Sequence, residues 1–142
     1  MRAWKERGLR RFAARAARLV VETVPRPAAD VITYIPPDGD RSLKRGHHPA
    51  QRLASELAVA WGIECRPLLS RARPVARQTG LSLAERRRNV RGSFAATAAP
   101  GCAVVVVDDV YTTGATVDAA AAALCGAGAV HVHVVTFARA VR

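Results

Sequence analysis

A run of small apolar residues, Ala103–Val107, leads directly into two adjacent acids, Asp108 and Asp109. An uninterrupted apolar run of this length is typical of a strand that is buried on both faces in a parallel sheet. After it, the Ala-rich segment Thr113–Cys125 predicts a helix, and Val130–Ala138 predicts a final strand. Strand, helix and strand in this order predict a parallel βαβ unit.

The first half of the chain continues the alternation of strands and helices. Apolar spacing, turn residues and the position of prolines predict four elements: a helix over 5–23, a strand over Val31–Ile35, a helix from Pro49 to Gly62 and a strand around Cys65–Leu69. We therefore predict an α/β fold with a doubly wound, mostly parallel sheet and flanking helices. A length of 142 residues fits a single domain over 1–142.

About thirty residues, Ser70 to Gly101, lack a core pattern in the sequence. A loop of this length inside a compact domain is usually a lid or a binding loop, so we expect a flexible hood there. Within it, Ser82–Glu85 has capping-box spacing and predicts a short helix through Asn89.

The formal net charge of +11 is compatible with phosphate ligands or nucleic acid. The basic residues are 20 Arg and 2 Lys beside 29 Ala, a bias typical of a GC-rich genome, so the charge proves neither partner. No apolar run is long enough to span a bilayer, and the N-terminal segment lacks the pattern of a signal peptide. We therefore expect a cytoplasmic protein with no membrane partner.

Scattered cysteines and histidines give no strong metal pattern. Cys65, Cys102 and Cys125 are far apart, which favours reduced core residues over disulfides or zinc ligands. His131 and His133 share one face of the last expected strand, but a satisfied histidine face is favoured over a metal pair because no third ligand is visible.

Arg7, Arg11, Arg15 and Arg18 line one face of the first expected helix, opposite an apolar face that includes Phe12. A solvated face is the favoured interpretation, and a basic stripe for nucleic acid is the alternative. Single-stranded nucleic acid usually stacks on aromatic platforms, and the chain has only seven aromatic residues. Any binding of DNA is therefore expected to be weak and electrostatic.

The stretch from Asp108 to Thr116 carries the chemistry. Ligands of open α/β sheets bind at the carboxyl ends of the strands, and the helix that follows offers free N–H groups to an anion. Carboxylates suit sugar hydroxyls and hold hard cations such as Mg²⁺. The alternative is an acid pair that only ends a strand and caps a helix. A response-regulator site is excluded because the acid pair of such domains lies near their start, whereas only 33 residues follow this pair. A P-loop nucleotide hydrolase is excluded because the sequence lacks the GxxxxGK[ST] motif.

This stretch resembles the 5-phosphoribosyl-1-pyrophosphate (PRPP) motif of type I phosphoribosyltransferases: four apolar residues, two acids and a Thr/Gly-rich phosphate loop. The resemblance implies that Asp108 and Asp109 contact the ribose hydroxyls, with Mg²⁺ as the cofactor beside them. It implies phosphate binding by the rest of the motif: Val110, Tyr111, Thr112, Thr113, Gly114, Ala115 and Thr116. Whether Tyr111 is a spacer or packs over the sugar stays open.

Segments over nearly the whole chain resemble the ComF/GntX family of competence-associated, amidophosphoribosyltransferase-like proteins: Trp4–Gly8, Lys44–Ala54, Gln78–Leu81, Arg86–Asn89 and Gly92–Phe94. Two features depart from the family pattern. His47 and His48 follow Gly46, where an aromatic residue and Asn are common. The Cys-rich zinc segment that opens longer members is not seen, so no zinc site is assigned.

The family resemblance implies roles for two further segments. Arg41, Lys44 and Arg45 follow the first core strand, where such enzymes place the pyrophosphate loop. The hood would contribute Gln78, Arg86 and Asn89, although a solvated charge run is an equal alternative for Arg86–Arg88.

Two functions are therefore expected. The first is Mg²⁺-assisted transfer at the anomeric carbon of PRPP, or binding of a nucleoside 5′-phosphate, with an acceptor that the sequence does not identify. The alternative is a non-catalytic protein of this fold that acts in DNA uptake with DNA or a competence-machinery partner. A homodimer is compatible with either.

Overall fold

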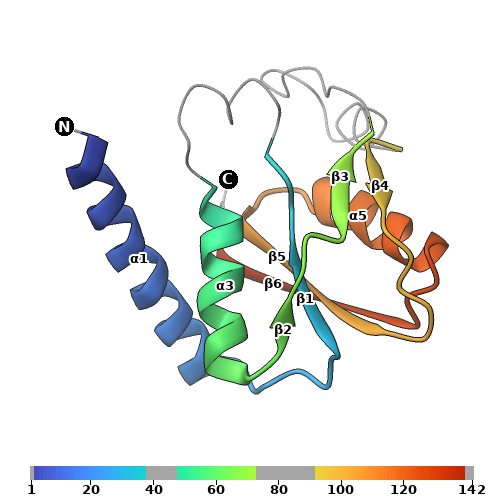
Figure 1. Cartoon of the computed structure of the whole chain (residues 1–142), viewed down its shortest axis with the longest axis horizontal. Coiled ribbons are helices and arrows are strands. Elements are labelled where there is room, and N and C mark those ends of the chain that lie inside the picture. Colours follow the sequence, from blue (N-terminus) through green and yellow to red (C-terminus); the bar gives the residue numbers. More distant parts are fainter. Residues whose placement is uncertain (1, 38–47, 73–91, 140–142) are drawn as a thin grey trace.

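The computed structural model of the chain describes residues 2–37, 48–72 and 92–139, with side chains from Phe12 onward. Its helices and strands in chain order are α1 (Arg2–Thr23), β1 (Val31–Tyr34), α3 (Pro49–Trp61), β2 (Glu64–Cys65), β3 (Leu69–Arg71), β4 (Phe94–Ala96), β5 (Ala103–Tyr111), α5 (Ala115–Gly126) and β6 (His131–Arg139) (Figure 1).

Four parallel strands form the main sheet in the order β2-β1-β5-β6. β5 is central: Val31–Tyr34 of β1 pairs with Val104–Val107 on one side, and β6 pairs along the whole of β5 on the other. Helices α1 and α3 lie on one side of the sheet and α5 on the other (Figure 1). The predicted doubly wound, mostly parallel α/β fold is confirmed.

The uninterrupted apolar run in β5 follows from this layering. Val105 and Val107 pack into a core cluster with α1 and α3, whereas Val104 and Val106 pack into a second cluster with α5, β3 and β4. All four valines are fully buried, since side chains of a strand alternate between the two faces of the sheet. Each one contributes about 1.5–3 kcal/mol by leaving water. A polar residue at any of them would face a packed core.

Helix α1 packs through its small residues rather than its large ones. Ala13, Ala16, Ala17 and Val20 are buried, so α1 approaches its neighbours closely. Phe12 was expected on the buried face, but 57% of its surface is exposed. Its ring packs in a T-shaped arrangement with that of Phe137 on β6, with centroids 5.4 Å apart. In the part of α1 whose side chains are described, Phe12 and Leu19 therefore lie at the margin of the buried face.

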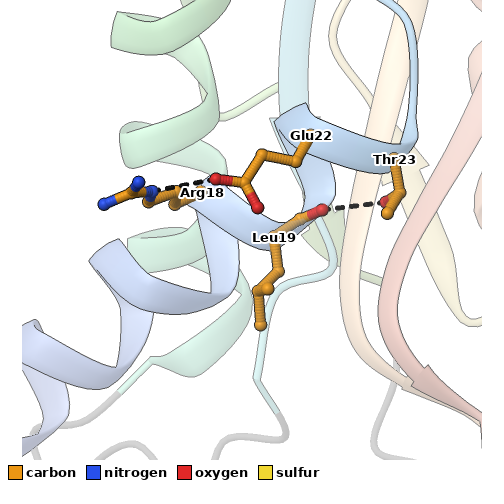
Figure 2. Close-up of polar contacts among 4 residues, drawn as sticks. All are labelled: Arg18, Leu19, Glu22 and Thr23. Atoms are coloured by element: carbon orange, nitrogen blue, oxygen red, sulfur yellow. Dashed lines mark hydrogen bonds and ion pairs between the residues drawn. The ribbon is translucent and has the colours of Figure 1, made fainter.

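Polar contacts mark the last turn of α1 (Figure 2). Arg18 Nε lies 2.9 Å from Glu22 Oε1, in an i,i+4 ion pair whose side chains are both solvated. The hydroxyl of Thr23 donates to the carbonyl oxygen of Leu19 at 2.8 Å. A Thr hydroxyl within a helix commonly bonds to the carbonyl oxygen four residues earlier in this way. One of the four arginines on the expected basic face is therefore already paired with a carboxylate.

The segment expected as one strand at Cys65–Leu69 divides into two short strands in different sheets. β2 pairs with β1, whereas β3 pairs in antiparallel fashion with β4. Phe94 and Ala99 are buried in the cluster with α5, and Ser93 is fully buried. The expectation that 70–101 lacks core residues is therefore wrong at its C-terminal end, and at its N-terminal end Ser70 and Arg71 belong to a paired strand. The middle, 73–91, lies outside the described residues together with the expected short helix.

Other boundaries differ by a few residues. β5 continues through both acids to Tyr111, where a turn was expected after Val107, and α5 begins at Ala115 rather than Thr113. The backbone hydrogen bonds of β6 hold β5 in register to its end. Within the part of the chain that the structure describes, no helix has the length and apolarity needed to cross a membrane.

Candidate sugar phosphate site

Asp108 and Asp109 lie at the carboxyl end of the central strand. Asp108 is the register partner of Thr136 on β6. The side chains of Asp108 and Asp109 are half-buried. The backbone N–H of Asp109 donates to Asp108 Oδ1 at 2.9 Å, which fixes the orientation of the first carboxylate. Both acids therefore stand at the sheet edge where ligands of parallel sheets bind.

The environment of Asp108 disfavours its negative charge. Burial is the main cause, and the neighbouring charge of Asp109 adds to it, so that the pKa of Asp108 rises to about 7. The N–H of Asp109 and the positive charge of Arg71 lower this pKa in part. An acid whose pKa is strongly shifted, in a hollow at the end of a strand, is a feature of functional sites.

A tight turn joins β5 to α5 and presents the start of the helix. Gly114 is the N-cap residue with φ 80°, a left-handed conformation that glycine adopts without strain. The N–H of Asp118 donates to the carbonyl oxygen of Gly114 at 2.8 Å and closes the first helical turn. The N–H of Ala115 reaches the Thr113 hydroxyl at 3.4 Å. Thr113 therefore serves the turn itself.

The ring of Tyr111 lies directly against Gly114. A Cβ atom on Gly114 would lie 2.5 Å from Tyr111 Oη and 3.0 Å from its Cζ. The guanidinium of Arg139, the register partner of Tyr111 on β6, lies 5.9 Å from the ring centroid. Tyr111 therefore packs over the turn, and the sequence alone left this role open.

An open hollow of about 170 Å³ lies at this turn. Its walls are Asp108, Val110, Tyr111, Thr112, Gly114, Thr116 and Val117. Six of these seven residues belong to the predicted motif, and Val117 was not predicted. Asp109, Thr113 and Ala115 do not line the hollow. The hollow is open to solvent, so a ligand bound there would contact these walls on one side and extend beyond them.

Arg71 is a site residue that sequence reasoning placed only at the base of the hood. Its Nε donates to the carbonyl oxygen of Pro36 at 3.2 Å, and its guanidinium lies 4.3 Å from the ring centroid of Phe94. Its charge acts on Asp108, as the pKa of that acid indicates. The pairing of β3 with β4 places it there, and no local sequence signal announces that pairing.

The candidate pyrophosphate contacts Arg41, Lys44 and Arg45, and the hood candidates Gln78, Arg86 and Asn89, lie outside the described residues. His131 and His133 have ring centroids 4.7 Å apart at the opposite end of β6 from Thr136. Among the residues with described positions, no group of three or more His, Cys, Asp or Glu side chains is arranged to hold a metal ion.

Comparison with known proteins shows what this chain is similar to. No protein-family model matches the chain. The DNA utilization protein YhgH of Salmonella typhi is 34% identical over 135 residues, which are 87% of this chain and 58% of that protein. The chain therefore spans less than two thirds of this relative.

Solved structures show the same fold. The allosteric regulatory enzyme of purine biosynthesis matches with a TM-score of 0.59 and 29% identity, over 91% of this chain and 25% of that one. Glutamine PRPP amidotransferase from B. subtilis, complexed with ADP and GMP, matches with a TM-score of 0.60 and 27% identity. The match covers 88% of this chain and 26% of that one. Purine phosphoribosyltransferase from Pyrococcus horikoshii Ot3 supports the fold alone, with a TM-score of 0.51 and 21% identity. The match covers 88% of this chain and 70% of that one.

The chain thus has a type I phosphoribosyltransferase fold. The resemblance that the sequence predicted is confirmed at the level of this similarity to the relative from Salmonella typhi and of the fold.

Proposed function

We propose that the hollow binds PRPP or a nucleoside 5′-phosphate and that the protein transfers the ribosyl group with release of pyrophosphate. One observation carries this proposal: the Asp108 carboxylate and the turn at the start of α5 line the same hollow. A sugar phosphate needs both features at once, hydroxyl partners for the ring and donors for the phosphate.

The turn Thr112–Thr116 would hold the 5-phosphate. N–H groups at the start of a helix lack partners within the helix, and the helix dipole favours an anion there. Thr112 and Thr116 line the hollow and can donate their hydroxyls, whereas Thr113 is engaged with Ala115. Gly114 lets the phosphate approach the backbone closely, since it carries no Cβ.

The acids would hold the ribose. Asp108 lines the hollow, and Asp109 orients it through its backbone N–H. A sugar hydroxyl can donate to a carboxylate or accept from a carboxylic acid, so Asp108 can bind the ring in either protonation state. Arg71 would offset the negative charge gathered around these acids.

Mg²⁺ fits this donor set when it arrives with the ligand. Proteins usually bind Mg²⁺ through one or two carboxylates, substrate phosphates and several waters. Asp108, which lines the hollow, would supply one carboxylate, and Asp109, which follows it in β5 but does not line the hollow, is the proposed second one. The ion would neutralise the charge that develops on the leaving pyrophosphate.

In the proposed reaction an amine or nucleobase forms a bond to the anomeric carbon as the bond from that carbon to the pyrophosphate oxygen breaks. Both electrons of the broken bond leave with pyrophosphate. The described residues hold the two ends of the sugar: the turn fixes the 5-phosphate and Asp108 fixes the ring hydroxyls. Such positioning can lower a barrier without a protein nucleophile. Arg41, Lys44, Arg45 and the hood residues remain proposed contacts of the pyrophosphate and the closed site.

An assay of pyrophosphate release tests the catalytic part of the proposal. We expect PRPP and Mg²⁺ to yield pyrophosphate with at least one amine or nucleobase in a panel of acceptors. Asp108→Ala should reduce the rate by about a hundredfold or more, because an anchor of the ring is lost. Tight binding of PRPP without turnover across the panel would contradict transfer and favour a non-catalytic role.

The alternative is a non-catalytic role in DNA use, which is favoured by the name of the Salmonella typhi relative, a DNA utilization protein. In that case the site would sense a ligand or serve as scaffold, and DNA or a partner of the competence machinery would meet the arginine-rich surface. Arg15 and Arg18 are exposed on α1, although Arg18 is paired with Glu22.

DNA binding by the isolated protein should be weak, sequence-independent and steeply dependent on salt, because released counterions dominate such binding. Replacing Arg7, Arg11, Arg15 and Arg18 together with Gln should remove most of it. Filter binding across a salt series measures the effect, with Arg66→Gln as a control for the loss of one exposed arginine. Tight binding that persists at high salt would contradict this expectation and indicate a dedicated nucleic-acid surface.

A further inference from the structure

Arg139 lies beside Tyr111, one of the residues that line the hollow, on the strand next to β5. It ends β6 as the register partner of Tyr111, and its side chain is exposed. The guanidinium lies 5.9 Å from the centroid of the Tyr111 ring, within the range of a cation–π contact. Tyr111 in turn lies against Gly114, the residue at the centre of the turn. One aromatic ring therefore links the guanidinium to the turn.

The charge of Arg139 has no acidic partner among the described side chains. The ion pairs in this part of the chain join Arg18 to Glu22 and Arg66 to Glu64, and both are remote from the turn in sequence and fold. A cation that rests on an aromatic face instead of a carboxylate keeps its hydrogen-bond donors available to a ligand.

Among the described residues, the turn offers only neutral donors. The described walls of the hollow contribute two threonine hydroxyls, backbone N–H groups and one acid, Asp108, with no lysine or arginine. A sugar phosphate carries more than one negative charge at neutral pH. The partial positive charge of a helix start, about half an elementary charge, balances it only in part.

We propose that Arg139 binds the phosphate of the ligand and supplies the positive charge that the turn lacks, with Tyr111 as the platform that positions its guanidinium. Arginine suits this role because its planar fork donates two parallel hydrogen bonds to phosphate oxygens. The proposal rests on the proposed function of the hollow, and it adds a residue from β6 that lies outside the PRPP motif.

Ribose 5-phosphate is the probe, titrated by calorimetry into wild-type protein and three variants. Arg139→Gln should weaken its affinity by about ten- to a hundredfold, the range for a hydrogen bond to a charged group. Arg139→Lys should recover part of this loss, because Lys keeps the charge without the fork. Arg66→Gln, which removes an equally charged exposed residue, should bind like wild type.

Salt dependence separates a direct contact from a structural effect. The affinity of the wild type should fall more steeply with salt than that of Arg139→Gln, because one fewer cation meets the phosphate in the variant. Equal affinities and equal salt slopes, with ribose 5-phosphate bound by both proteins, would overturn the role of Arg139 and leave the proposed function intact. Failure of wild-type protein to bind the probe at all would overturn the proposed function, and this inference with it.

Discussion

Asp108→Asn should raise the stability of the ligand-free protein at pH 8 by about 2–4 kcal/mol while it weakens ligand binding. The folded chain holds a charged Asp108 in a place that disfavours the charge, since the pKa of this acid is about 7 there and 3.8 in an ordinary setting. Asn keeps the oxygen that accepts from the N–H of Asp109 and removes the charge. The melting temperature should rise by about 5–10 °C.

The contribution of Asp108 to the free energy of unfolding depends on pH with a definite sign. Between pH 3.8 and about 7 the folded protein keeps a proton on Asp108 that the unfolded chain has released. Stability from this group is therefore fully present below pH 3.8 and is lost as the pH rises towards 7. The difference in unfolding free energy between Asp108→Asn and wild type should be near zero at pH 4 and complete at pH 8.

Chemical denaturation at both pH values measures this difference, and Asp118→Asn serves as the matched control. Asp118 is an exposed acid in the first turn of α5, where the helix dipole favours its charge. Its replacement should slightly destabilise the protein at pH 8. A stability gain of Asp108→Asn that is the same at pH 4 and pH 8 would show that the charge of Asp108 is not its cause.

Gly114→Ala should abolish binding of ribose 5-phosphate, with a loss of affinity of at least about a hundredfold. The added methyl group would meet Tyr111 Oη at 2.5 Å, so the ring must move, and it would stand where the phosphate approaches the backbone. The left-handed conformation of Gly114 adds about 1–2 kcal/mol of strain for any residue with a Cβ.

Gly62→Ala is the control that separates strain from site geometry. Gly62 ends α3 with φ 63°, and a Cβ atom there would have no neighbour within 4 Å. Both variants should lose similar stability from backbone strain, but only Gly114→Ala should lose the ligand. Calorimetry with ribose 5-phosphate decides between them. Equal affinities in the two variants would mean that the phosphate does not contact this turn.

Local patterns in the sequence predicted the parts of the fold that depend on neighbours along the chain. The apolar run of β5 and the proline and glycine that bound α3 each carry their signal within a few residues. Phe12 was misplaced, because periodicity shows which residues share a helix face but does not show how much of that face is covered. The strands β3 and β4 were missed since their pairing joins segments about twenty residues apart.

The candidate site was predicted to a similar extent. The motif identified six of the seven residues that line the hollow, because one strand end and one helix start are contiguous in sequence. Arg71, whose charge acts on Asp108, and Arg139, which lies beside Tyr111, belong to other strands, and the sequence does not display the sheet pairing that places them there. Their position depends on which strand lies beside which, and this order is a property of the folded sheet.

Calorimetric titration of the wild-type chain with PRPP in the presence of Mg²⁺ tests the central claim most directly. We predict one binding site per chain with a Kd between about 1 μM and 1 mM, the range of ordinary enzyme–substrate pairs. Asp108→Ala and Gly114→Ala should lose this heat signal while Gly62→Ala keeps it. Absence of binding by the wild type, or undiminished binding by both site variants, would contradict the assignment of a sugar phosphate site to this hollow.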